Sequence, residues 1–211
     1  MHGIRTIAIG AAAAIALMTP TVASAAVFTP SQAGSLTPNS YDGSVDAAPD
    51  YWQFGASGRE GYARMVYRPA PPWSAGETHS FGGRFLLNSE SGYVSLLRAD
   101  NYALYGHDGY VFGVARYTGD HLGHLVVGTY SGDDQEIGPP FPIPIGIWFD
   151  LKVTITVGSS IAVSMDGVPV ASGSYHTPPG NERITAVRSG VVATGNLGQI
   201  DVRQQYFAVD E

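Results

Sequence analysis

The chain of 211 residues contains no cysteine. That absence excludes a disulfide framework, a thiolate nucleophile and a zinc site ligated by cysteine. Charged residues are scarce as well, at 14% of the sequence against about a quarter in an average globular domain. Hydrophobic residues still reach 44%, which is enough apolar material for a core, so the composition argues against intrinsic disorder.

Positive charge is in deficit, with 11 lysines and arginines against 18 aspartates and glutamates and a net charge of −7. A protein that binds nucleic acid needs a basic surface for the phosphate backbone, so nucleic acid is not an expected partner. Helical periodicity is missing too, because in no window of helical length do apolar residues recur with the helical period. The length suits one large domain or two small ones.

Residues 1–25 have the three-part pattern of a secretory signal peptide. Arg5 supplies a positive charge, the uncharged apolar run Ile7–Met18 follows, and Ala23-Ser24-Ala25 offers small residues at a cleavage site. The apolar run has 12 residues, whereas a helix that spans a membrane needs about 20. We therefore predict cleavage near Ala25 and export, to the extracellular space or the exterior of the cell envelope. A buried alanine-rich helix is the alternative, and no later segment resembles a membrane span.

From Tyr51 onward the sequence has the pattern of β-strands, in short runs of branched and aromatic residues separated by Gly, Asn, Asp and Ser. In Asp150–Val157 every second residue is apolar, and the alternation resumes at Ile161–Met165 after the turn residues 158–160, which predicts a hairpin. The other predicted strands are Phe81–Leu87, Tyr93–Arg98, Tyr110–Tyr117, Leu122–Tyr130, Val168–Ala171, Ile184–Val192 and Gln199–Val209.

About ten short strands joined by turns predict an all-β fold, a two-sheet antiparallel β-sandwich of the jelly-roll type, over residues 50–211. The proline-rich stretch Gly138–Gly146 cannot donate regular ladder bonds, so we expect it to carry the chain from one sheet to the other. Residues 26–49 are rich in Ser, Thr, Pro and Gly and are predicted to form an irregular N-terminal segment.

The hairpin region, Ile145–Val157 followed by Ile161–Val170, resembles the concanavalin A-like lectin/glucanase superfamily, and most closely its laminin G-like jelly rolls. In that family a Gly-x-Trp motif opens a strand, a hairpin follows, and the return strand ends in Asp-Gly. The matching residues here are Gly146, Trp148, Asp166 and Gly167. The resemblance covers roughly residues 80–209. It implies the jelly-roll fold and a lectin-like or polysaccharide-cleaving protein, without choosing between them.

The catalytic motifs that the resemblance would imply are missing. Glucanases of the superfamily use Glu-x-Asp-x-x-Glu, whose carboxylates flank the sugar bond as nucleophile and acid. The nearest acidic cluster here, Asp133–Glu136, precedes a glycine and two prolines and is expected to be a loop. Alginate-lyase-like members use the motifs Arg-x-Glu-Leu and Gln-x-His, and neither motif occurs in this sequence. The sequence therefore favours a binding module over an enzyme.

Polar residues on apolar strands supply candidate binding groups, because such side chains either reach water at a strand end or line a groove. Three share a strand face with apolar or aromatic neighbours: Arg98 with Val94 and Leu96, Arg116 with Phe112 and Val114, and His124 with Val126 and Tyr130. If these faces converge on one sheet, they form a cationic, aromatic-walled trough for a glycan. The candidate glycan-binding residues are Arg98, Arg116, His124, Tyr130, Tyr105 and His107.

Asp100 and Asp108 are candidate oxygen ligands for calcium, with ordinary turn capping as the alternative. The histidines lack the spacing of a zinc site. Trp73, which lies between prolines and a serine, is predicted to be exposed, whereas Trp148 at the start of an alternating strand is predicted to lie in the core.

Three functional hypotheses follow from these observations. The first is a secreted, non-enzymatic, lectin-like module that binds a glycan or another surface polymer. The second is a secreted polysaccharide lyase or hydrolase that works in the concave groove of the same fold. The third is a structural protein of the cell surface that interacts with other components and binds no sugar.

Overall fold

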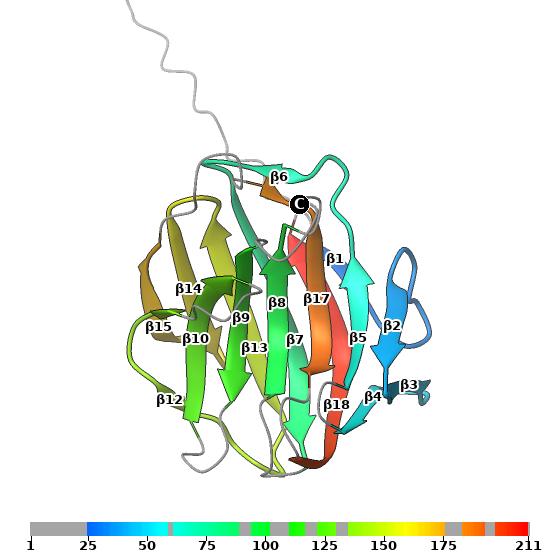
Figure 1. Ribbon diagram of the computed structural model, residues 1–211. Helices are drawn as coiled ribbons and strands as arrows, with labels where there is room; N and C mark the ends of the chain where they lie inside the picture. The colour runs from blue at the N-terminus through cyan, green and yellow to red at the C-terminus, as the bar shows by residue number, and fades with distance from the viewer. Residues whose placement is uncertain are drawn as a thin grey trace, which may run out of the picture.

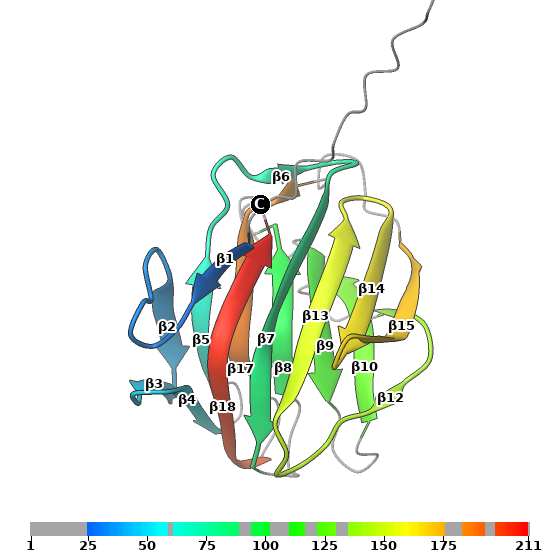
Figure 2. The ribbon, with the colours of Figure 1, turned by 180° about the vertical axis from the view of Figure 1, so that it is seen from behind.

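The computed structural model describes residues 25–58, 61–88, 94–101, 110–116, 122–129, 135–175, 183–192 and 197–210. The regular structure of these residues consists of β-strands in two eight-stranded sheets, one in front of the other, and a small third sheet (Figures 1 and 2). All the pairings in the sheets are antiparallel. The prediction of a two-sheet antiparallel β-sandwich is confirmed. Among the described residues there is no helix long and apolar enough to cross a membrane.

The sheet nearer the viewer in Figure 1 is named the front sheet. Its strands, in order across the sheet, are β11 (Gln135–Glu136), β10 (Leu122–Thr129), β9 (Tyr110–Arg116), β8 (Val94–Asp100), β17 (Ala186–Val192), β5 (Tyr62–Tyr67) and β2 (Thr37–Tyr41), and β12 (Phe141–Pro142) also pairs with β10. Neighbours in this sheet are often far apart in the sequence, because β17 lies between β8 and β5.

The back sheet faces the viewer in Figure 2. Its strands, in order, are β15 (Val168–Ser174), β14 (Ser160–Met165), β13 (Phe149–Thr156), β7 (Thr78–Leu87), β18 (Leu197–Asp210), β4 (Trp52–Gly58) and β3 (Gly43–Ala47), and β1 (Ala25–Phe28) pairs with β18. The third sheet consists of β6 (Trp73–Ser74) and β16 (Arg183–Ile184).

The predicted hairpin and crossing are both confirmed. β13 and β14 pair with Val153 opposite Val163, and the side chains of β13 alternate between buried and exposed or half-buried positions. The proline-rich stretch pairs with β10 of the front sheet through β12, and the chain then enters β13 of the back sheet. This crossing joins the two layers on which the core depends.

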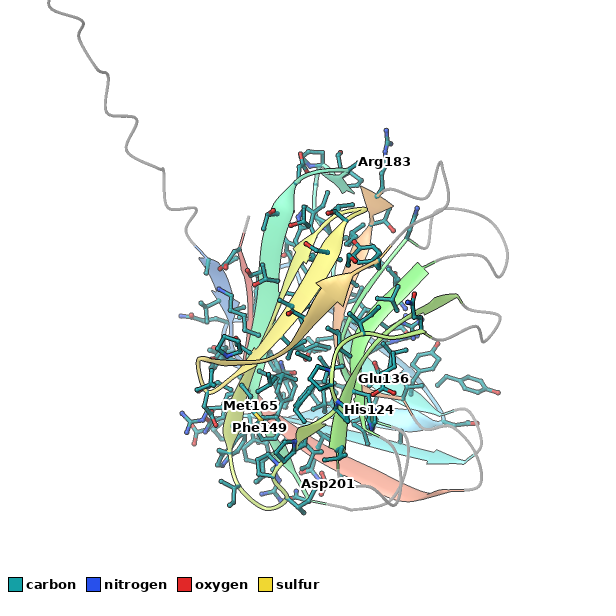
Figure 3. The ribbon with its side chains drawn as sticks, turned by 90° about the vertical axis from the view of Figure 1, so that its left-hand side faces the viewer. His124, Glu136, Phe149, Met165, Arg183 and Asp201 are labelled. Carbon is teal, nitrogen blue, oxygen red and sulfur yellow. The ribbon has the colours of Figure 1, made fainter. Side chains whose placement is uncertain are left out.

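The core lies between the two sheets and is filled from both sides (Figure 3). Its largest fully buried side chains are Phe54, Phe81, Phe85, Phe149, Phe207, Leu87, Leu96, Leu97, Leu125, Leu151 and Ile155. A hydrogen bond from Ser189 Oγ on β17 to Gln204 Oε1 on β18, over 2.8 Å, joins the layers. Because Ser189 points into the core, its neighbours Arg188 and Gly190 belong to the outer face of the front sheet.

Residues 26–49 differ from the prediction of an irregular segment, because β1, β2 and β3 lie within or at the edge of this stretch. β1 pairs with the last strand, with Ala25 opposite Asp210. The side chains of β2 are all exposed and those of β3 nearly so. Edge strands of this kind carry no alternation of apolar and polar residues, so the residue pattern does not predict them.

The two tryptophan predictions are corrected. Trp73 is 3% exposed and its ring stacks on His79, with 4.2 Å between the ring centroids and 3° between the planes. The small third sheet and β7 therefore hold Trp73 against the core despite the adjacent prolines. Trp148 is half-buried rather than part of the core, because it precedes β13 instead of lying within it.

Candidate functional site

The register of the front sheet brings three arginines onto its outer face. Arg188 on β17 pairs directly with Arg98 on β8, and Gly190 on β17 pairs with Arg64 on β5. Directly paired residues of an antiparallel ladder project from the same side of the sheet. Arg64, Arg98 and Arg188 therefore share the face opposite to Ser189, whose side chain points into the core.

The arginines gather around one carboxylate. Nη2 of Arg188 donates a hydrogen bond to Asp100 Oδ1 over 3.2 Å, and Nε of Arg188 lies 3.1 Å from Asp100 Oδ2. Nε of Arg98 lies 3.5 Å from the same Oδ2 atom. We name Arg64, Arg98, Arg188 and Asp100 the arginine cluster.

The arginine cluster is buried, except for the half-buried Arg98, although it lies outside the core. Arg64 is 6% exposed, Arg188 7% and Asp100 1%. Burial raises the pKa of the Asp100 carboxyl, and the guanidinium groups of Arg188 and Arg98 oppose that rise. A buried charge is costly unless it is paired, so Asp100 and its two arginine partners depend on one another.

Two tyrosines extend the arginine cluster toward the edge of the sheet. The guanidinium carbon of Arg64 lies 4.0 Å from the ring centroid of Tyr62, at a distance typical of a cation–π contact. Tyr62 pairs with Tyr41 across β5 and β2, and their ring centroids are 6.1 Å apart. Tyr41 is 58% exposed. We name Tyr41 and Tyr62 the tyrosine pair, which gives this face an aromatic surface beside fixed positive charge.

Gly190 makes room for Arg64. Its φ is +147°, which a residue with a side chain rarely adopts. A Cβ atom at this position would collide with the backbone oxygen of Ala63 and lie 2.6 Å from the Cα of Arg64. A small cavity lined by Gly190, Ser95 and the three arginines remains between these strands.

His124 lies on the same outer face, farther along the sheet. It pairs with Ala115, two residues beyond Gly113, the ladder partner of Arg98. Nδ1 of His124 lies 2.6 Å from Glu136 Oε1 on β11, and Figure 3 shows the two side chains together. The imidazole and the carboxylate therefore satisfy one another at this end of the face.

The sequence predicted some of this face and missed the rest. Arg98 and His124 both lie on it, but Arg98 does not share a face with Leu96, because a bulge between Ser95 and Leu97 shifts the alternation and Leu96 enters the core. Arg116 is part of β9, opposite Val94 of β8, and its side chain is outside what the structure describes. The predicted residues that lie outside the described ranges are Tyr105, His107, Tyr130 and the calcium candidate Asp108.

The residues that sequence reasoning missed are Arg64, Arg188, Tyr41 and Tyr62. A signal was present in two of the strands, because Arg64 and Arg188 each interrupt an apolar run, in Tyr62–Tyr67 and Ala186–Val192. Neither run shows which distant strand it pairs with, so the sequence does not predict that Arg64 and Arg188 lie close together. Asp100, proposed as a calcium ligand, directs both carboxylate oxygens at arginine nitrogens. Among the described residues, no group of three or more acidic or histidine side chains forms a metal site.

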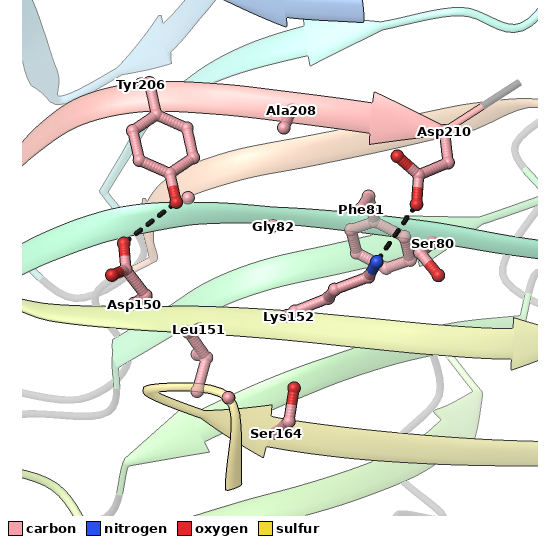
Figure 4. A pocket seen from close by; sticks show the side chains of 12 residues that line it. Ser80, Phe81, Gly82, Asp150, Leu151, Lys152, Ser164, Tyr206, Ala208 and Asp210 are labelled. Carbon is pink, nitrogen blue, oxygen red and sulfur yellow. Dashed lines mark hydrogen bonds and ion pairs between the residues drawn. The ribbon is translucent and has the colours of Figure 1, made fainter. Parts of the chain in front are cut away.

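The back sheet has a hollow of its own, with a volume of about 280 Å³ (Figure 4). Gly82 lines it, and a Cβ at this position would lie 2.5 Å from the backbone oxygen of Leu151 on the neighbouring strand. The Tyr206 hydroxyl donates to Asp150 Oδ1 over 2.8 Å, and Lys152 Nζ donates to Asp210 Oδ2 over 3.1 Å. These polar groups already satisfy one another, so the hollow is a weaker candidate than the front sheet.

Sequence comparison finds no match for this chain, either among family models or among curated proteins. Solved structures are similar in fold. A prokaryotic β-1,3-1,4-glucanase (lichenase) from a mouse hindgut metagenome aligns with a TM-score of 0.65 and 9% identity, over 89% of this chain and 99% of the other.

Two larger proteins contain a similar unit. The binding domain of botulinum neurotoxin serotype C1 aligns with a TM-score of 0.56 and 11% identity, over 83% of this chain and 43% of that one. A mutant of Trypanosoma rangeli sialidase aligns with a TM-score of 0.55 and 13% identity, over 83% of this chain and 27% of that one. The chain thus spans less than half the length of these two. Together the three likenesses show that it has the jelly-roll fold of the concanavalin A-like proteins.

Proposed function

We propose that this protein is an exported, non-enzymatic module that binds a glycan on the outer face of its front sheet. The observation that carries the proposal is the tyrosine pair beside the arginine cluster. The C–H face of a sugar ring stacks on an aromatic ring, while its hydroxyls take directional hydrogen bonds from fixed polar groups. The outer face supplies both within one patch.

Proteins of similar fold support a saccharide ligand. Cell entry of botulinum neurotoxin type C depends on interaction with two ganglioside molecules, and the binding domain of neurotoxin DC is known in complex with SialylT. The lichenase is named for its glucan substrate. The fold alone does not decide function, so the proposal of a glycan ligand depends on the side chains of the front sheet.

The acidic groups of this face support a binding role rather than hydrolysis. A glycoside hydrolase needs two carboxyl groups that flank the bond to be cleaved. Of the described residues on the outer face, Asp100 is held by Arg188 and Arg98, and Glu136 is held by His124. Neither carboxylate is positioned as an unengaged acid or nucleophile.

A tyrosine truncation tests the proposed surface. Glycan-array screening of the purified protein selects a ligand, and calorimetry then measures its affinity. Replacing the exposed Tyr41 with alanine should weaken binding about fivefold to tenfold, because one stacking contact is lost. Tyr206→Ala, on the outer face of the back sheet, is the matched control and should leave the affinity unchanged. Equal losses in both variants would contradict the front sheet as the binding face. No bound glycan at all would overturn the proposal and favour a structural interaction protein.

The non-enzymatic part has its own test. Incubation with a panel of uronate polysaccharides should yield no rise in the absorbance of unsaturated products, and no new reducing ends should form from neutral glucans. A sustained rise in either signal would identify a lyase or hydrolase instead.

Export is tested by the mature N-terminus. When the full chain is expressed in a secreting host, N-terminal sequencing of the protein in the medium or envelope fraction should begin at Ala26. Recovery of the intact Met1 terminus inside the cell would contradict this part of the proposal.

A further inference from the structure

The outer face of the front sheet holds more fixed positive charge than sugar hydroxyls require. Arg64, Arg98 and Arg188 lie there together, and the anionic side chain described among them is Asp100. Arg68, exposed just beyond the end of β5, also acts on Asp100 electrostatically. One carboxylate cannot neutralise this number of guanidinium groups.

Among the described residues, Arg64 is the member of the arginine cluster that forms no close ion pair with an acidic side chain, although its charge also helps to lower the pKa of Asp100. Its side chain is almost fully buried, and its guanidinium group lies over the ring of Tyr62. The Nε atom of Arg64 has no hydrogen-bond partner there. A buried cation of this kind is costly, so an anion that pairs with it gains a strong, charge-assisted interaction.

The arginine cluster gathers positive charge in a protein whose net charge is −7. General attraction of anions to the surface is therefore unfavourable, and an anion that binds must gain from local contacts. A guanidinium group offers parallel N–H donors whose spacing fits the two oxygens of a carboxylate or a sulfate. Arg64 presents such a group beside the aromatic surface.

We propose that the glycan bound by this face is acidic, with a carboxylate or sulfate group on the sugar next to Arg64 and the sugar ring against Tyr62 and Tyr41. This inference rests on the proposed glycan-binding function and adds the class of saccharide. Asp100 has a separate role in it: the carboxylate holds Arg188 and Arg98 in place, and Arg64 contributes the charge that selects the ligand.

The test compares matched pairs of oligosaccharides by calorimetry. One pair contains glucuronate and glucose oligomers of the same linkage, and a second contains sulfated and unsulfated forms of one oligosaccharide. An acidic member should bind at least about tenfold more tightly than its neutral partner, and added salt should reduce this difference. Equal or tighter binding of both neutral members would overturn the inference while the proposed function stands. Absence of all binding would overturn the proposed function itself.

Variants then assign the preference to Arg64. Arg64→Gln should lose roughly tenfold in affinity for the acidic sugar and keep its affinity for the neutral one, whereas Arg64→Lys should recover part of the loss. Arg84→Gln makes the same charge change at an exposed position of the back sheet and should change neither affinity. Melting curves show whether each variant is folded. If folded Arg64→Gln keeps the full preference for the acidic sugar, Arg64 is not the residue that selects it. If that variant fails to fold, the salt dependence of binding by the unmodified protein still tests the inference.

Discussion

Arg98 and Arg188 face one another across β8 and β17, and both direct guanidinium nitrogens at the carboxylate of Asp100. Asp100 and Arg98 come from one strand, whereas Arg188 comes from a strand 88 residues farther along the chain than Asp100. The cluster therefore ties two strands of the front sheet together on the outer side, opposite the core.

Neutralising Asp100 should destabilise the protein. In Asp100→Asn the buried Arg188 and the half-buried Arg98 lose their counter-ion, and removal of one partner from a buried ion pair costs about 3 to 5 kcal/mol. Chemical denaturation measures the free energy of unfolding. Asp46→Asn, at an exposed position of the edge strand β3, is the control and should stay within about 0.5 kcal/mol of the unmodified protein. Equal stability of the two variants would contradict the structural role of Asp100.

A methyl group at position 190 should be poorly tolerated. Gly190→Ala brings a Cβ against the backbone of Ala63 and Arg64 at a φ of +147°, so we expect a loss of about 3 kcal/mol in unfolding free energy. Gly167→Ala has a positive φ of +78° with nothing within 4 Å of the added atom, so it should lose only about 1 kcal/mol. If both variants lose the same amount, close packing at Gly190 is not the cause.

Stability at high pH should depend on Tyr206. Burial, together with the hydrogen bond to Asp150 and the charge of Asp150, raises the pKa of Tyr206 to about 12. The neutral phenol is favoured in the folded state, so its contribution is complete below the unfolded value of about 10 and disappears as the pH rises toward about 12. Unfolding free energies measured across this window should fall more steeply for the unmodified protein than for Tyr206→Phe.

A spectroscopic titration checks the same group directly. The difference in tyrosinate absorbance between the unmodified protein and Tyr206→Phe reports the ionisation of Tyr206. A midpoint near 10, or identical stability profiles for the two proteins, would contradict the link between Tyr206 and Asp150.

The hairpin of β13 and β14 was predictable because one face of these strands packs against the core and the other faces outward. Along β13 the side chains alternate between the core and the outside, and a period of two in hydrophobicity follows directly from that alternation. The front sheet offers no such contrast. In β8 and β17 nearly every side chain is buried, including Arg188 on the outer face, and Arg98 is half-buried, so no period separates inside from outside.

The site depends on two further facts that local sequence does not contain. The bulge between Ser95 and Leu97 moves Arg98 to the face opposite the one that simple alternation assigns to it. The order of strands in the front sheet places Arg64 and Arg98 on either side of β17, which follows both of them in the chain by many residues. Sequence reasoning could name Arg98 as a binding residue, but it could not bring Arg64 and Arg188 to it.

The most direct test of the glycan-binding face is a titration of the backbone amide resonances with an acidic oligosaccharide, followed by nuclear magnetic resonance. Our account predicts that the shifts concentrate on β2, β5, β8 and β17, around the tyrosine pair and the arginine cluster. Shifts that concentrate instead on β7 and β13, around the hollow of the back sheet, would contradict it.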